Sequence, residues 1–169
     1  DLGLAGSDLR AAERTFQLMR QGAGRAGRAE APGTALLQTY QPDHPVIRAI
    51  LAGDEEGFWQ AEAREREQAG MPPYGRLAGI ILSGPDLAAV FDAGNQLARN
   101  DRALRDVGAQ VYGPAPAPIA RVRGRHRVRL LVKAEKSVAL QRALAQWVGQ
   151  IRLKGDLRLA VDIDPQSFY

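Results

Sequence analysis

The stretch RVRGRHRVRLLVK, residues 121–133, sets the expected sheet of this protein. Arginine occupies every second position from 121 to 129, and apolar residues dominate the positions that follow. Successive side chains on a β-strand point to opposite faces, so this alternation predicts a strand pair or one long strand with a charged row. Gly124 lies within the charged part and marks a tight turn between two strands.

The length of that turn decides which side chains share a face. A two-residue turn divides the arginines between the two faces and exposes apolar side chains to water. A three-residue turn, Arg123–Arg125, keeps the two kinds of side chain apart. The pattern therefore favours the longer turn, with Arg121, Arg127 and Arg129 on one face and Ala120, Val122, Val128, Leu130 and Val132 on the other.

The residues around this pair predict a small α+β domain. Their order is strand, helix, strand, strand, helix, strand, which is the split βαβ or ferredoxin-like order with an antiparallel four-stranded sheet. Helices of such a domain cover one face of the sheet. The expected elements are a strand at 77–83, a helix beginning at Gly84-Pro85-Asp86, a strand at 108–112, an extended crossing at 113–118, the strands within 121–133, a helix capped by Ser137 and a strand at 157–163.

The first seventy residues read differently. Apolar spacings of three and four predict a helix over about 8–23, and residues 34–40 read as one strand. Two helices, 45–51 with Asp43 as a possible cap and 54–68, form a connector. The stretch GMPPYG at 70–75 cannot continue a helix. We therefore expect three segments: the end of one domain at 1–42, the connector at 43–70 and the α+β domain at 71–169.

Composition narrows the classes of function. The chain has 169 residues, is 45% hydrophobic and contains no cysteine, which excludes disulfides and thiolate metal sites within it. Two histidines leave no metal cluster to propose. No run of about 18 apolar residues occurs, so no membrane span is expected. The net charge is +4, and the five arginines of 119–129 occur without an acid, which favours a polyanionic partner.

A second arginine motif, QGAGRAGR at residues 21–28, closes the first predicted helix. Glycines let the backbone come close to a ligand, and two arginines three positions apart can face one anion. The simpler interpretation is a helix stop in an arginine-rich chain. No P-loop sequence occurs, so this chain alone is not expected to hydrolyse ATP.

Further matches surround this motif. RTFQL at 14–18, PG at 32–33 and LLQTY at 36–40 accompany it, and together they resemble the last conserved motif of superfamily 2 helicases. The resemblance extends to the end of the chain and is narrower there. MPPYGRL at 71–77, GPAPAP at 113–118, RGRHR at 123–127 and VDIDP at 161–165 are similar to the replication-restart helicases of the PriA (primosomal protein N′) family.

This resemblance implies a C-terminal part of a cytoplasmic, ATP-dependent 3′–5′ DNA helicase. Residues 1–42 would then end the second RecA-like lobe. ATP and Mg²⁺ would bind the parent protein, and zinc would bind an insertion missing from this sequence. The start at Asp1, which has no initiator Met and no leader pattern, fits a cut within a longer chain.

The resemblance also assigns roles to single residues. Arg28 would approach the γ-phosphate, Arg25 would help to hold the phosphates or the contact between lobes, and Gln21 would orient water or couple the site to DNA. The partners would be branched DNA at stalled forks, the acidic tail of single-stranded-DNA-binding protein and other primosome proteins. Gln141 and Arg142 are the candidates for the tail.

The charged strand pair is the candidate DNA contact. It offers cations and no acid or amide, so it favours phosphate or shape recognition over base reading. A solvated edge strand protected by its charge is the simpler alternative. A non-enzymatic nucleic-acid-binding module of ribosomal or regulatory type is the second possible function. The candidate contacts are Arg121, Arg123, Arg125, His126, Arg127 and Arg129.

Overall fold

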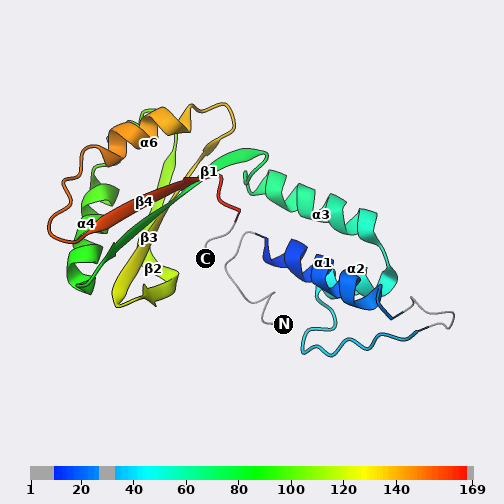
Figure 1. Ribbon diagram of the computed structural model, residues 1–169. Coiled ribbons are helices and arrows are strands. Elements are labelled where there is room, and N and C mark those ends of the chain that lie inside the picture. The colour runs from blue at the N-terminus through cyan, green and yellow to red at the C-terminus, as the bar shows by residue number, and fades with distance from the viewer. Residues whose placement is uncertain (1–9, 27–32, 167–169) are drawn as a thin grey trace. The chain divides into compact units, whose positions relative to one another are not determined.

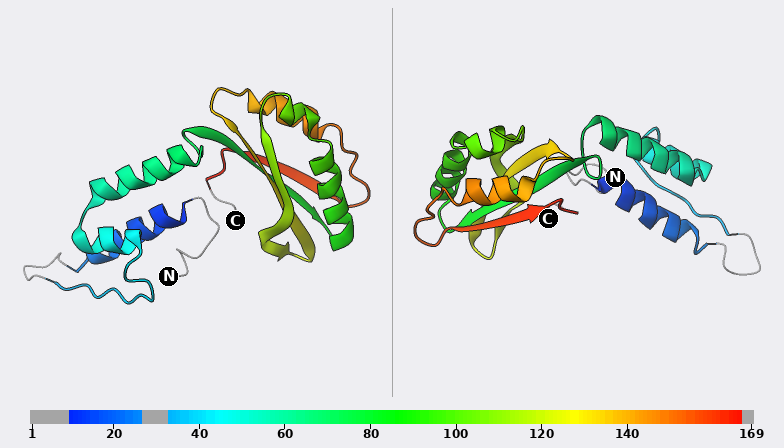
Figure 2. Two further views of the ribbon diagram at one scale, coloured as in Figure 1. Left: turned by 180° about the vertical axis from the view of Figure 1, so that it is seen from behind. Right: turned by 90° about the horizontal axis from the view of Figure 1, so that it is seen from above.

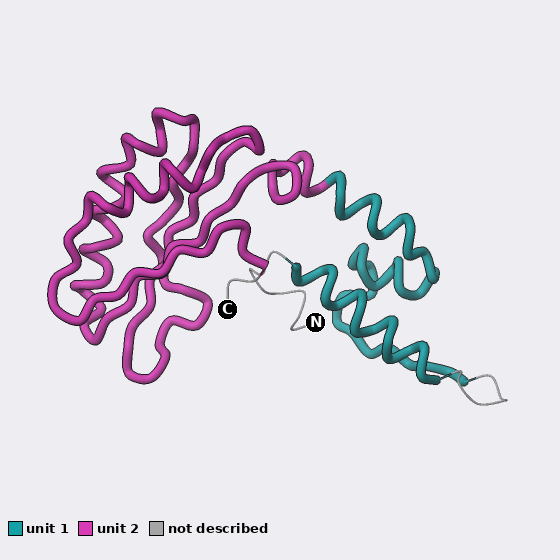
Figure 3. Tube along the Cα trace, turned by 45° about the horizontal axis from the view of Figure 1, so that its top comes forward, with its two compact units in different colours: residues 1–64 teal, residues 65–169 magenta. Residues whose placement is uncertain are grey.

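The computed structural model describes residues 10–26 and 33–166. It divides into two compact units, residues 1–64 and 65–169, which Figure 3 shows in different colours. Each unit is described by itself.

The first unit contains helices and connecting segments. Helix α1 spans Ala11–Ala23, α2 spans Pro45–Ala52, and α3 spans Glu55–Gln68, whose last residues belong to the second unit. The described part of α1 confirms a helix ending at residue 23, while the start expected near residue 8 lies outside the described residues.

Aromatic rings hold the helices of the first unit together. Phe16 of α1 is 1% exposed and stacks on Phe58 of α3 with ring centroids 4.1 Å apart. Trp59 meets Phe58 edge to face at 4.9 Å. Val46 of α2 completes the buried cluster. Offset and edge-to-face aromatic pairs add stabilisation beyond the area they bury.

Two local predictions for this unit are wrong. Residues 34–40 have no strand conformation, because no described segment of this unit pairs with them. A strand depends on hydrogen bonds to a neighbour, and an unpartnered apolar segment has none. The cap of α2 is His44 and not Asp43, because the His44 Nδ1 atom accepts a hydrogen bond from the Val46 amide at 3.3 Å.

The second unit is an α+β domain with a four-stranded sheet, as predicted (Figure 1). The sheet order is β2-β3-β1-β4, and every neighbouring pair is antiparallel. The elements in chain order are β1 (Gly75–Gly84), α4 (Leu87–Arg99), the short helix α5 (Arg102–Arg105), β2 (Gln110–Val122), β3 (Arg125–Glu135), α6 (Leu140–Val148) and β4 (Arg158–Ile163).

One core joins the helices to a single face of this sheet, and Figure 2 shows the arrangement from two further sides. Val128, Leu130 and Val132 alternate along β3 and are fully buried in that core. Trp147 of α6 is also fully buried, and its indole Nε1 donates a hydrogen bond to the Leu97 carbonyl of α4 at 3.0 Å. That bond satisfies the one polar atom of the indole, so the tryptophan can fill the core.

Two element boundaries differ from the predictions. Helix α6 begins at Leu140, and its N-cap Ala139 makes no side-chain cap, so the assignment of Ser137 as cap is wrong. Strand β2 runs on from the predicted 108–112 through the proline-rich crossing to Val122. A proline is tolerated there because β2 is an edge strand, where a missing N–H can face away from the ladder.

Candidate nucleic-acid interface

The arginine hairpin, defined here as residues 119–129, turns over two residues and not three. Val122 pairs with Arg125, and Arg121 pairs with His126, which leaves Arg123 and Gly124 as the turn. Their φ angles are 49° and 78°, the positive values that a type I′ turn requires at both central positions. The twist of this turn matches that of the strands, which favours it over the predicted longer turn.

This turn divides the arginines between the two faces of the hairpin. Arg121 lies opposite His126, whereas Arg127 and Arg129 have the opposite parity along β3. Ile119 and Val122 are accordingly exposed at 43% and 38%. The prediction that Arg121, Arg127 and Arg129 share one face is therefore wrong. A two-residue turn was expected to expose apolar side chains to water, and it does so at Ile119 and Val122.

Arg125 holds the base of the hairpin. Its guanidinium donates to the Ser83 carbonyl of β1 at 3.0 Å and forms an ion pair with Asp156, in the loop before β4. Its side chain is 20% exposed. These contacts make Arg125 a link between the hairpin and two other parts of the sheet.

The arginines nearest the turn are the most accessible. Arg121 and Arg123 are exposed, and neither forms an ion pair with a described residue. Arg127 is half-buried and donates to the Ile119 carbonyl at 3.5 Å, while His126 is also half-buried. The hairpin thus presents two cations at its turn, where a phosphate can approach without displacing an internal partner.

Arg129 lies further along β3, away from the turn. Partial burial lowers the pKa of its guanidinium from the ordinary value, because desolvation disfavours the charged form. An arginine remains charged at neutral pH even so.

The residues proposed to serve a nucleotide are only partly described. Gln21 lies in the last turn of α1, and Arg25 follows the helix; both are exposed. Arg28 lies outside the described residues. Gln141 and Arg142, the candidates for a partner tail, are exposed in the first turn of α6.

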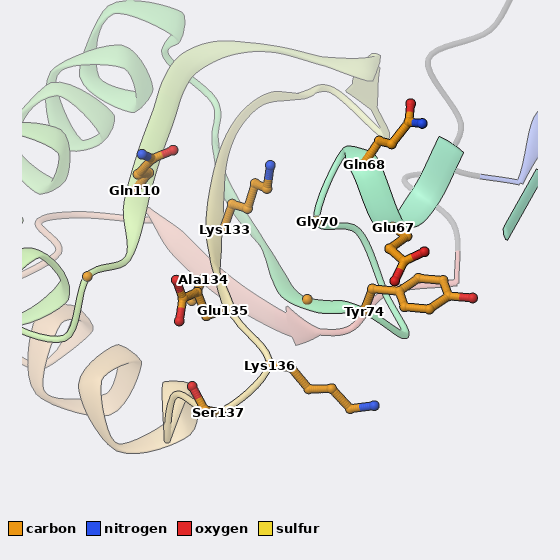
Figure 4. A pocket seen from close by; sticks show the side chains of 12 residues that line it. Glu67, Gln68, Gly70, Tyr74, Gln110, Lys133, Ala134, Glu135, Lys136 and Ser137 are labelled. Carbon is orange, nitrogen blue, oxygen red and sulfur yellow. The ribbon is translucent and has the colours of Figure 1, made fainter. Parts of the chain in front are cut away.

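A pocket that the sequence did not predict lies within the second unit (Figure 4). Its volume is about 620 Å³. Gln110 of β2 and Lys133 of β3 are directly opposite each other in the ladder and both line it. Tyr74 and Glu67 line it from the segment before β1. The sequence signal was weak, because these residues converge only through the strand register.

The described residues carry neither a metal cluster nor a membrane span. No group of three or more His, Cys, Asp or Glu side chains in 10–26 and 33–166 is placed to hold a metal ion. In the same ranges, no helix has the length and apolar character needed to cross a membrane.

Comparisons with known proteins match this chain to proteins of replication restart. Residues 67–166 match the family described as primosomal protein N C-terminal domain. The replication restart protein PriA of Rickettsia conorii is 38% identical over 169 residues, which is 100% of this chain and 26% of that protein. The PriA proteins of Haemophilus influenzae and Bacillus subtilis are 34% and 33% identical, over 99% and 94% of this chain and 23% and 20% of their own lengths.

These matches relate the chain to the class of replication restart proteins. More particularly, the chain belongs to the PriA family. It spans about a quarter of the length of the first of these relatives.

Proposed function

We propose that this chain is the C-terminal region of a cytoplasmic, ATP-dependent 3′–5′ DNA helicase. The intact protein would bind branched DNA at stalled replication forks and start primosome assembly. Membership of the PriA family supports the assignment to replication restart. The observation that carries the DNA-binding part is the turn of the arginine hairpin, where Arg121 and Arg123 are exposed and form no ion pair with any residue that the structure describes.

The second unit would serve as the DNA-binding domain of that helicase, with a ferredoxin-like fold. The chain order of its strands and helices and the antiparallel sheet order β2-β3-β1-β4 support that fold. The hairpin extends from the edge strand β2 and its neighbour β3, so its turn is accessible to a duplex. Guanidinium groups there would contact phosphates and would leave the base sequence unread.

The first unit would contribute to nucleotide hydrolysis in the intact helicase. Arg28 would reach the γ-phosphate, Arg25 would hold phosphates or lobe contacts, and Gln21 would orient water or couple the site to DNA. The exposure of Gln21 and Arg25 at the end of α1 fits such a supporting role. The remaining ATP and Mg²⁺ ligands would come from other parts of the helicase, since this chain has no P-loop.

Zinc does not fit the residues described here. The chain has no cysteine, and its described acids and histidines form no cluster of three. A zinc site of the intact helicase would therefore need ligands from an insertion outside this chain. No role of the second unit depends on it.

Other proteins of the primosome would bind the same region. The acidic tail of single-stranded-DNA-binding protein would meet Gln141 and Arg142, whose exposure on α6 leaves an amide and a cation accessible. A guanidinium suits a carboxylate because it can donate two parallel hydrogen bonds.

The DNA-binding proposal is tested by fluorescence anisotropy with a labelled fork, a blunt duplex and a structured RNA. Arg121→Ala/Arg123→Ala is the test variant. Arg99→Ala/Arg152→Ala is the matched control, because it removes the same charge from exposed positions of the second unit. Loss of two phosphate contacts should reduce the slope of log K against log salt by about 2.

Two results would count against this proposal. If both double variants lower affinity for the fork equally, the hairpin has no special role. If the unmodified chain binds structured RNA as tightly as forked DNA, the non-enzymatic module becomes the better interpretation.

A further inference from the structure

The sheet face opposite the helices has a composition that the arginine hairpin does not explain. Its residues are those that alternate with the buried core positions of the strands. From the register they form four cross-strand rows: Gln110 with Lys133 and the buried Leu77; Tyr112 with Leu131, Gly79 and Asp162; Ala115 with Arg129, Ile81 and Ala160; and Arg127 with Ser83 and Arg158. We call this surface the open sheet face.

We propose that the open sheet face binds an unpaired nucleic-acid strand, with Tyr112 as a stacking platform for a base. This inference rests on the proposed function, since it assumes that the second unit contacts DNA. It differs in the state of its ligand, because the hairpin turn would hold the phosphates of a duplex. The open sheet face shares only Arg127 and Arg129 with the hairpin. Helices α4, α5 and α6 contribute their buried residues to the core on the other side of the sheet.

Charge favours a polyanion on this face. Arg127, Arg129 and Lys133 have the same parity along β3, with Leu131 between Arg129 and Lys133, and Arg158 stands on β4. Asp162 is the acid within the four rows. Arg158 also lies 3.6 Å from Asp156, an exposed pair that water and salt screen strongly. The excess of cations runs along a strand and matches the spaced phosphates of a single strand.

Tyr112 supplies the stacking surface that a charge pattern alone lacks. It lies on the edge strand β2 and is 49% exposed. Its hydroxyl donates to the Gln110 side-chain oxygen at 2.6 Å, which restricts the orientation of the ring. A tyrosine that is half exposed and held by a hydrogen bond can accept a base at a small entropy cost.

The neighbours of Tyr112 in its row are apolar as far as Asp162 of β4. Leu131 lies next to it across the ladder, and the following residue in that row is Gly79, which has no side chain. Gly79 is buried, and the row is apolar between the ring and Asp162 at its far end. An unstacked base meets aromatic and aliphatic groups there, and Lys133 stands in the neighbouring row.

The pocket continues this surface at one end. Gln110 and Lys133 both belong to the open sheet face and both line the 620 Å³ pocket. From Arg127 to Lys133 the strand covers about 20 Å, which is enough for several nucleotides of an extended strand. Recognition of unpaired bases by aromatic residues on a sheet is a general physical solution for single strands.

The test uses the whole 169-residue chain and a fluorescein-labelled dT12 strand, with a blunt duplex measured in parallel. Tyr112→Ala should weaken dT12 binding between about fivefold and about 150-fold, the range for loss of one stacked base. Tyr112→Phe should bind within about twofold of the unmodified chain, because the ring remains. Tyr40→Ala is the matched control, since Tyr40 is a 95% exposed tyrosine of the first unit.

A second measurement needs no change to the protein. A strand with the same backbone but abasic sites should bind more weakly than dT12 to the unmodified chain. Tyr112→Ala should discriminate less between the two strands, because the group that reads the base is gone. Equal binding of dT12 and the abasic strand by the unmodified chain would overturn the stacking role.

The outcomes separate this inference from the proposed function. If Tyr112→Ala binds dT12 like the unmodified chain while the hairpin variant loses the fork, the inference fails and the proposed function stands. If the unmodified chain binds neither the fork nor dT12, both fail. Equal losses for Tyr112→Ala and Tyr112→Phe would also overturn the inference, because the hydroxyl and not the ring would then matter.

Discussion

Replacing Arg125 by alanine should destabilise the second unit, although the residue lies among the proposed DNA contacts. The change removes a charged hydrogen bond to the Ser83 carbonyl and an ion pair with Asp156. The bond from a 20% exposed guanidinium is worth about 1.5–3 kcal/mol. Asp156 is 58% exposed, so the ion pair adds less than about 1 kcal/mol. We expect a total loss of about 1.5–4 kcal/mol.

Urea unfolding followed by tryptophan fluorescence measures this loss. A Trp59→Phe background removes the indole of the first unit, so that Trp147 alone reports on the second. Arg123→Ala is the control. Arg123 is exposed and has no ion pair within the described part of the chain, so its loss should change stability by less than about 0.5 kcal/mol. If Arg125→Ala unfolds at the same urea concentration as Arg123→Ala, the anchoring role assigned to Arg125 is incorrect.

Three further substitutions test packing. Gly22→Ala should stabilise the first unit by up to about 1 kcal/mol in thermal unfolding, because a Cβ there meets no atom within 4 Å; a lower midpoint would contradict this. Gly94→Ala should cost about 1–3 kcal/mol, since its Cβ would lie 2.9 Å from the Pro114 Cβ, and an unchanged urea midpoint would refute the tight contact. Trp147→Phe should cost at least about 1–3 kcal/mol in calorimetry because the Leu97 carbonyl loses its donor; retention of the unfolding temperature would disprove that role.

Local signals predicted most of the second unit. The stretch Gly84-Pro85-Asp86 indicated a helix start, and the Asp86 side chain does cap α4 by accepting from the Ala88 amide at 3.0 Å. Apolar periodicity likewise gave the strands and the antiparallel sheet. A helix cap and an alternating strand pattern depend on residues close together in the sequence, so both can be predicted from one sequence.

The hairpin turn could not be predicted in the same way. Alternation predicts a three-residue turn only where the ladder is regular, but residues 117–120 lie opposite the single residue 127. This bulge shifts the register after Pro116, so alternation before it no longer predicts alternation after it. Gly124 adopts positive φ at no steric cost and is a local signal for the turn, whereas nothing in the sequence indicates that Arg123 also has positive φ.

Only those parts of the candidate site that lie close together in the sequence could be predicted. A run of arginines is visible in sequence, so Arg121 and Arg123 were found. The structural use of Arg125 was not, because Ser83 and Asp156 are distant in the chain. Tyr112 was missed because its row becomes visible only when the registers of four strands are known.

The prolines of β2 have a consequence for how copies of this protein behave together. Pro114, Pro116 and Pro118 remove three amide donors from an edge strand that is also interrupted by two register shifts. A strand of a second chain could not pair with β2 through a continuous ladder of backbone hydrogen bonds. The border of the sheet that lies beside Tyr112 is thereby kept from self-association, so a concentrated solution of the protein should resist fibre formation through β2.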